Sequence, residues 1–141
     1  MKKGVLALLA LVLVSCSSSI KQTGKKPLFE VLTQQSDGGA NIRFFEILSE
    51  PNEIAMLQND DQLKHKIHPG DVQTSSFIVL NLGEKTTGGY QIEVESAVET
   101  DKNIIVTIKE TIPVPGSMTT QGISKPYCVV KINSKKEIII K

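Results

Sequence analysis

The stretch LNLGEKTTGGYQIEV, residues 80–94, decides the fold. An apolar strand enters it, a Gly/Thr loop occupies its centre, and a strand of alternating apolar and polar residues leaves it. In the leaving strand Tyr90, Ile92 and Val94 share one face, and the polar residues between them share the other. The pair Gly88-Gly89 opens backbone conformations that other residues avoid and lets a partner approach the main chain closely. The pattern predicts a recognition loop on a β scaffold.

The composition indicates a strand-rich core. Hydrophobic residues make up 40% of the 141 residues, but only 4% are aromatic and none is tryptophan. The core must therefore consist mainly of Ile, Val and Leu, a composition that favours strands. With 16 Lys and Arg against 15 Asp and Glu the chain is nearly neutral. This balance argues against a nucleic-acid partner, for which a basic stripe is expected.

The N-terminus has the pattern of a bacterial lipoprotein signal. Two lysines precede the apolar run GVLALLALVLV, which is too short to span a bilayer as a mature helix. The run leads into Leu-Val-Ser-Cys, which resembles the lipoprotein box; the resemblance implies cleavage of the chain on the N-terminal side of Cys16 and lipidation of that cysteine. The alternative is an ordinary secreted protein in which Cys16 is incidental. We expect a signal peptide over residues 1–15 and a flexible tether over residues 16–27 that begins with lipidated Cys16.

This anchor predicts where the protein works and how its domain is stabilised. Two or more acyl chains such as palmitate on Cys16 hold a protein to a membrane stably. Residues 17–26 contain no acidic residue, so we expect the outer membrane facing the periplasm. Removal of 15 residues from 141 leaves 126, enough for one β-rich domain over residues 28–141. Cys128 then has no intramolecular disulfide partner, and stability must come from the core.

The first half of the domain predicts a hairpin and a helix. Strands over residues 28–33 and 42–48 flank the turn sequence SDGG, so the two strands are expected to pair with each other. Residues 49–51, Ser-Glu-Pro, mark a helix start with the serine hydroxyl as its cap. The polar stretch 59–75 has the weakest pattern and predicts at most one further helical turn.

The second half of the domain reads as strands joined by loops. Residues 77–82 form a continuous apolar run, typical of a central strand covered on both faces. Residues 90–98 are expected to pair with it through the central loop. Further strands are expected over residues 104–108, 127–133 and 137–140, with a Pro/Gly-rich loop over residues 113–122. The fold class is therefore α+β: a mostly antiparallel sheet, sandwich-like or curled, with one short helix packed on it.

The sequence contains no pattern that predicts catalysis, a cofactor or a metal site. His65 and His68 have a spacing that places two imidazoles on one side of a helical turn, but no third ligand supports a metal. Cys128 stands in an alternating strand and is expected to be a buried structural cysteine. The chain is therefore predicted not to be an enzyme.

The two loops are the remaining candidates for function. One interpretation is that their glycines merely make turns. The other is that adjacent loops on a rigid sheet form one edge that binds a protein chain. The residues singled out in the two loops are Thr86, Thr87, Gly88, Gly89, Tyr90, Met118, Thr119, Thr120 and Gln121.

The same residues support a resemblance to a known family. The stretch GEKTTGGYQIEVE, followed by apolar alternation, a Pro-rich loop and Ser-Lys-Pro-Tyr before a final VVKI, resembles the PrcB C-terminal domain family. The family's named member is a lipoprotein component of a surface-protease complex. The resemblance implies a non-catalytic accessory protein that associates with and stabilises an envelope protein such as a protease. It adds Pro126 and Tyr127 to the candidate contact residues.

A fainter resemblance gives an alternative function. Thr-Thr-Gly-aromatic loops also occur in small β-sandwich inhibitors of papain-type cysteine proteases, in which the loop enters the active-site cleft. Those inhibitors have proline before the threonine pair and a second loop that ends in Arg-Pro-Trp. In this chain Lys85 takes the place of that proline, and Lys125-Pro126-Tyr127 is the nearest match to the second loop. The alternative is therefore a loop-mediated protease inhibitor.

Overall fold

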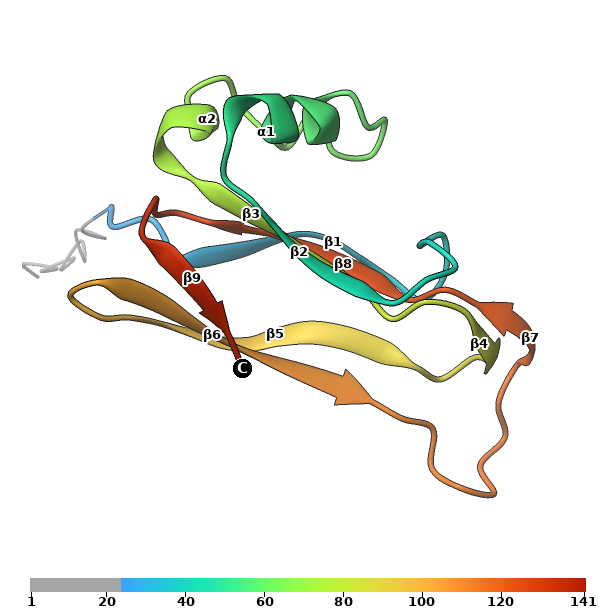
Figure 1. Ribbon diagram of the computed structural model, residues 1–141. Coiled ribbons are helices and arrows are strands. Elements are labelled where there is room, and N and C mark those ends of the chain that lie inside the picture. Colours follow the sequence, from blue (N-terminus) through green and yellow to red (C-terminus); the bar gives the residue numbers. More distant parts are fainter. Residues whose placement is uncertain (1–23) are drawn as a thin grey trace, which may run out of the picture.

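The computed structural model describes residues 24–141, which fold into two facing β-sheets with helices over one of them (Figure 1). The fold class is α+β and mostly antiparallel, as predicted. The elements in chain order are β1 (Phe29–Gln35), β2 (Phe44–Leu48), α1 (Pro51–Gln58), α2 (Asp71–Thr74), β3 (Ser76–Asn81), β4 (Lys85–Thr87), β5 (Gln91–Glu99), β6 (Asn103–Thr111), β7 (Gln121–Ser124), β8 (Tyr127–Ile132) and β9 (Glu137–Ile140).

The larger sheet has four antiparallel strands in the order β1-β8-β3-β2. Its two central strands, β3 and β8, are the most buried of the described strands, and only one residue in each is not fully buried. They pair through Val79 opposite Val129 and end at Asn81 opposite Tyr127. The prediction of a central strand covered on both faces is confirmed.

The smaller sheet has the order β5-β6-β9. β5 and β6 form a long antiparallel hairpin, and β9 joins β6 in parallel. A bulge at Glu95, between the pairs formed by Val94 and Ser96, shifts the alternation of β5. Beyond this bulge Ala97 turns toward the core and Val98 toward solvent.

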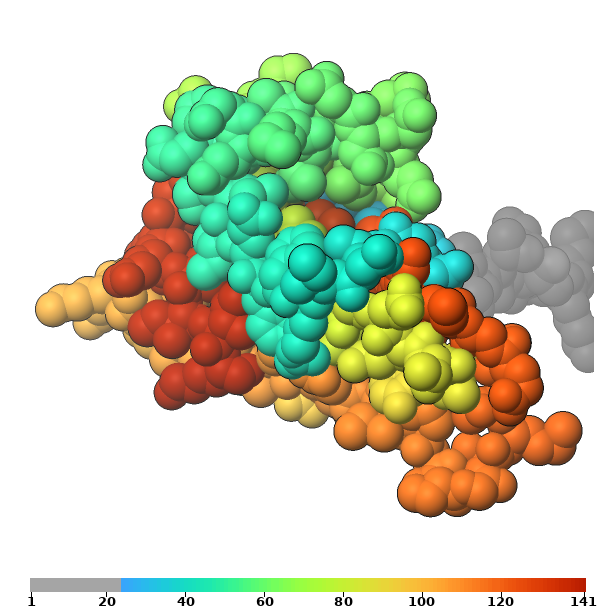
Figure 2. All heavy atoms as spheres, turned by 45° about the vertical axis from the view of Figure 1, so that its right-hand side comes forward, coloured from blue at the N-terminus to red at the C-terminus, as the bar shows by residue number. Residues whose placement is uncertain are grey.

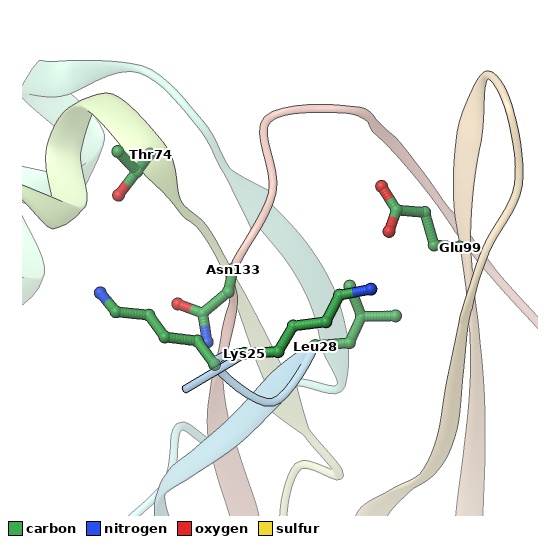
Figure 3. A pocket seen from close by; sticks show the side chains of 6 residues that line it. Lys25, Leu28, Thr74, Glu99 and Asn133 are labelled. Atoms are coloured by element: carbon green, nitrogen blue, oxygen red, sulfur yellow. The ribbon is translucent and has the colours of Figure 1, made fainter. Parts of the chain in front are cut away.

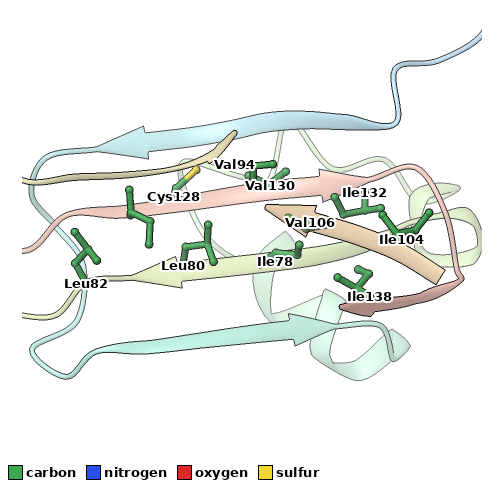
Figure 4. Packing of buried hydrophobic residues seen from close by; sticks show 11 residues of the cluster. Ile78, Leu80, Leu82, Val94, Ile104, Val106, Cys128, Val130, Ile132 and Ile138 are labelled. Atoms are coloured by element: carbon green, nitrogen blue, oxygen red, sulfur yellow. The ribbon is translucent and has the colours of Figure 1, made fainter. Parts of the chain in front are cut away.

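Side chains from both sheets meet in the main hydrophobic core (Figure 4). The larger sheet contributes alternate residues of β3 and β8, among them Leu80 and Val130, and the smaller sheet contributes Ile92 and Val106. Cys128 lies in this core, so the predicted buried cysteine is confirmed.

A second core lies between the larger sheet and the helices. Phe77 of β3 and Val129 of β8 lie on the side of the sheet that faces away from the main core. They pack there against Ile54 of α1 and against Leu63 and Ile67. Residues 59–75 were predicted as the least ordered part of the domain, and this is wrong. Two apolar side chains four residues apart anchor the segment, although polar residues surround them in the sequence.

Two predicted strand pairings are also wrong. β1 and β2 do not form a hairpin, since they lie at opposite edges of the larger sheet. The side chain of Asn81 accepts a hydrogen bond from the N–H of Ala40 and donates one to its C=O, at 3.0 Å each. These bonds fix the segment between β1 and β2 in an open path, so that the two strands do not form a hairpin. β3 and β5 do not pair either, because the loop between them carries the chain from one sheet to the other.

The helix start was predicted at the right place with the wrong cap. Glu50, not Ser49, occupies the N-cap position of α1. The carboxylate of Glu53 accepts hydrogen bonds from the backbone N–H groups of Ser49 and Glu50, each at 3.0 Å. These bonds lower the pKa of Glu53.

Candidate contact surface

A two-stranded ribbon, β4 with β7, stands at one end of the sandwich (Figure 1). Three residues separate β3 from β4, and two residues separate β7 from β8. Because β3 and β8 pair with each other, the ribbon prolongs the centre of the larger sheet. The predicted recognition loop therefore begins inside a strand and is carried by the most buried part of the fold.

Close glycine contacts hold the two predicted loops together. A Cβ on Gly88 would lie 3.2 Å from Thr120, and one on Gly89 would lie 2.9 Å from Pro113. The N–H of Gly88 also donates to the C=O of Thr120 at 3.0 Å. The loops are thus adjacent, as the sequence predicted, and the space beside these glycines is already filled by the second loop.

A tight turn shapes the second loop. The N–H of Ser117 donates to the C=O of Val114 at 3.0 Å across Pro115 and Gly116, and Gly116 has a φ of 80°. Proline followed by a glycine with positive φ is the signature of a type II turn. The loop therefore has a defined shape of its own.

The segment that contains this turn exposes apolar side chains without any charge. Residues 111–124 include no Asp, Glu, Lys or Arg. Four large apolar side chains of this segment are exposed: Ile112, Val114, Met118 and Ile123. In Figure 2 the segment, in orange, projects from the lower right of the molecule. Depletion of charge around exposed apolar groups is typical of the centre of a protein interface.

Sequence reasoning identified only Met118 among these four residues. The polar Thr119 and Thr120 were selected instead, and they serve partly to pack against the glycines. The absence of charge over the fourteen residues 111–124 is a signal in the sequence that points to the other three.

The remaining predicted residues separate into two groups. Thr86 and Gly89 are exposed, Thr87 is half-buried on the ribbon, and Tyr90, directly before β5, is half-buried against the main core. The Tyr90 ring lies 5.3 Å below the ammonium of Lys85. Pro126, by contrast, is fully buried. The Tyr127 hydroxyl lies on the helix side of the sheet, 3.2 Å from Gln62. The structure therefore does not bring Pro126 and Tyr127 onto the surface formed by the loops.

An open hollow of about 340 Å³ adjoins the ribbon. β7 forms one side of it, Gly88 and Gly89 lie at its margin, and Ser36 and Asp37 close it where β1 ends. The carboxylate of Asp37, its one charged lining residue, accepts a hydrogen bond from the N–H of Lys125 at 3.0 Å.

A larger open hollow of about 650 Å³ lies near the start of β1, away from the ribbon (Figure 3). Two of its polar side chains, those of Glu99 and Asn133, bond to other parts of the protein. Glu99 pairs with Lys136 at 2.9 Å, which lowers the pKa of the glutamate, and Asn133 donates to the C=O of Pro27 at 2.7 Å. These contacts fix the strand ends and show no pairing of a nucleophile with a base.

The other titratable candidates are placed as follows. Burial, with a smaller contribution from Glu93, raises the pKa of Cys128 to about 11, so the thiol stays protonated at neutral pH. His65 and His68 are exposed. Over residues 24–141 no three His, Cys, Asp or Glu side chains are grouped so that they could hold a metal ion.

The predicted signal peptide, the lipidated Cys16 and most of the tether lie outside the described residues. Within residues 24–141 no helix is both long and apolar enough to cross a bilayer.

Residues 76–133 match the sequence model of a protein family described as PrcB C-terminal. The resemblance predicted from the sequence is thus confirmed over the stretch from β3 through β8, which includes the ribbon and both loops. No curated protein and no solved structure matches the chain.

Proposed function

We propose, from the membership of residues 76–133 in the PrcB C-terminal family, that this protein is a lipid-anchored accessory protein without catalytic activity. It binds a protein of the bacterial envelope, such as a protease, and stabilises it. Cys16 holds it to the outer membrane on the periplasmic side. The family indicates the protease-complex role, and the anchor and the partner are our proposal.

One observation carries this proposal: the matched stretch contains residues 111–124, which expose large apolar side chains and include no Asp, Glu, Lys or Arg. Val114 and Met118 stand on a loop whose shape is fixed by its own turn and by the glycines of the other loop. A preformed apolar surface binds a partner without the cost of ordering a flexible loop. Such a surface suits stable association better than catalysis.

The test is capture of the full-length, membrane-anchored chain from detergent-solubilised membranes of its own host. We expect a defined envelope protein in stoichiometric amount. The double variant Val114→Ser, Met118→Ser should reduce its recovery at least tenfold. The matched control is Met56→Ser, Val98→Ser, which removes exposed side chains of the same types from α1 and from the far end of β5 and should leave recovery unchanged.

Two further readouts complete the test. Cys16→Ser should move the protein from the detergent phase to the aqueous phase, and deletion of the protein should shorten the half-life of the partner. A monomer that captures nothing at native abundance refutes the accessory role, and a Cys16→Ser variant that stays in the detergent phase refutes the anchor.

A further inference from the structure

The edge of β7 that faces away from β4 has no strand beside it among the described residues. In the adjoining part of the sheet, the corresponding edge of β8 is covered by β1, which pairs with it as far as Gln35 opposite Tyr127. Two residues before Tyr127, the C=O of Lys125 accepts a hydrogen bond from the N–H of Gly39 at 2.9 Å. Beyond Lys125 the chain that follows β1 no longer accompanies β7.

The hollow beside the ribbon adjoins this vacated strand position. Its lining includes Ser36 and Asp37, which follow the last residue of β1, all four residues of β7, and Gly88, Gly89 and Thr120 of the two loops. A strand placed in line with β1 would therefore lie in the hollow, alongside Gln121–Ser124.

The opposite side of the ribbon is covered differently. The N–H of Glu84, just before β4, donates to the C=O of Asn41 at 3.0 Å. A Cβ on Gly83 would lie 2.8 Å from the backbone of Arg43. The segment before β2 thus fills the space next to the start of β4, and the open strand position lies on the β7 side.

The chemistry around this position specifies what fits it. Unpaired edge strands are usually protected by charged side chains, lysine above all. β7 is Gln-Gly-Ile-Ser, and its Ile123 side chain is 63% exposed. The only charged side chain lining the hollow, that of Asp37, is already bonded to the N–H of Lys125. The position suits main-chain pairing with an uncharged segment.

We propose that an extended, uncharged segment of the partner protein adds as a strand beside β7, in line with β1, with an apolar side chain against Ile123. Strand addition of this kind takes its affinity from main-chain hydrogen bonds and its specificity from alternate side chains. The inference rests on the proposed function and names the form in which the partner is recognised.

A membrane surface is the less suitable occupant. The described chain starts at the end of the sandwich opposite the ribbon (Figure 1). An anchor that precedes it therefore joins the domain at the end far from β7.

The test compares two isoleucines on the captured full-length chain. Ile123→Lys places a charge on the β7 edge, whereas Ile139→Lys makes the same change on another edge strand, β9, at a residue that is 39% exposed and lies outside both the hollow and the charge-free segment. We expect Ile123→Lys to lower partner recovery at least tenfold and Ile139→Lys to lower it less than threefold. Equal losses, or no loss in either variant, overturn strand addition and leave the accessory role standing.

Amide hydrogen exchange on the captured complex gives a second measurement that does not depend on a variant. Strand addition should slow exchange of the β7 amides at least tenfold relative to the free chain, while the turn between β5 and β6 should be unchanged. Unprotected β7 amides in the complex overturn the proposal. The proposal is also overturned if phosphatidylethanolamine–phosphatidylglycerol vesicles protect the β7 amides equally well without the partner, because a membrane is then the occupant. Equal protection on raising the concentration of the chain alone overturns it as well, because the occupant is then a second copy of the chain. A chain that captures no partner refutes the proposed function itself.

Discussion

Lys131 is the residue before the last in β8 and is buried on the helix side of the sheet. Its ammonium is 2.9 Å from the Glu30 carboxylate and 3.5 Å from that of Asp71, which is itself buried. Burial opposes the charge on Lys131, but the contacts with the two carboxylates outweigh it and raise the pKa of the lysine. One side chain thus ties β8 to β1 and to α2.

Removal of this ammonium should be costly because it leaves Asp71 buried without its counter-charge. We expect Lys131→Met to lower the free energy of unfolding by about 3 kcal/mol, measured by urea denaturation at pH 7. Lys109→Met is the control, since Lys109 makes only an exposed pair with Glu93 at 3.9 Å, and it should change stability by less than about 0.5 kcal/mol. Equal effects of the two variants would contradict the structural role of Lys131.

The sequence predicted the faces of β8 but not the partners of Lys131. Alternation alone placed Cys128, Val130 and Ile132 on one face and Val129 with Lys131 on the other, and both placements are confirmed. Glu30 and Asp71 lie far from Lys131 along the chain, and no local pattern links them to it. Periodicity predicts the face of the strand on which a side chain lies, but it does not predict the residues that the side chain contacts.

At the scale of elements, the ribbon and the loop that contains the type II turn act as one unit. Gly89 has a φ of 91° and faces the Pro113 ring, whereas Gly116 has a φ of 80° and faces open space. The two glycines therefore share the same backbone requirement and differ in packing.

This difference gives a matched pair of variants. Gly116→Ala should cost only backbone strain, about 1 kcal/mol, whereas Gly89→Ala must also displace Pro113 and should cost about 2–4 kcal/mol. Thermal unfolding measures both, and amide exchange in residues 112–120 should accelerate in Gly89→Ala alone. Equal destabilisation by the two variants would show that Gly88 and Gly89 do not hold the loops together.

Element boundaries were easier to predict than element neighbours. The alternation of residues 90–94 located β5 correctly, and the Pro/Gly loop of residues 113–122 located the second loop except at its end, where β7 already begins at Gln121. The hairpin expected from SDGG failed because a turn signal reports a local change of direction, while Asn81 and Lys125 decide where the chain goes next. The adjacency of the two loops was predicted, but the strand pair that joins them, β4 with β7, was not.

For the whole molecule, four hydrogen-bonded carboxylates set the response to acid. Hydrogen bonds lower the pKa of each: Glu30 through Lys131, Glu53 through the start of α1, Glu99 through Lys136 and Glu110 through Arg43. Each group has a lower pKa in the folded state than the ordinary value of 4.5. Its contribution to stability is therefore complete above that pH and is lost as the pH falls through the folded-state value.

We expect the urea midpoint to be flat from about pH 6 to pH 8 and to fall steadily below about pH 4.5. The double variant Glu30→Gln, Glu110→Gln should be less stable at pH 7 and should lose less stability between pH 5 and pH 3. A variant whose midpoint falls as steeply as that of the native protein would show that these two groups do not govern the acid response.

The pairing of β1 with β8 has a consequence for the order in which the chain can fold. Phe29 lies opposite Ile132, so the larger sheet joins the first strand to the one before the last. A chain that emerges N-terminus first therefore holds β1 without its neighbour until almost the whole sequence has appeared. Because β1 and β8 are so far apart in the sequence, we expect folding to be slow, in the millisecond-to-second range. Until β8 arrives, the apolar β3 has a bare edge, and the nascent chain is then most prone to aggregate.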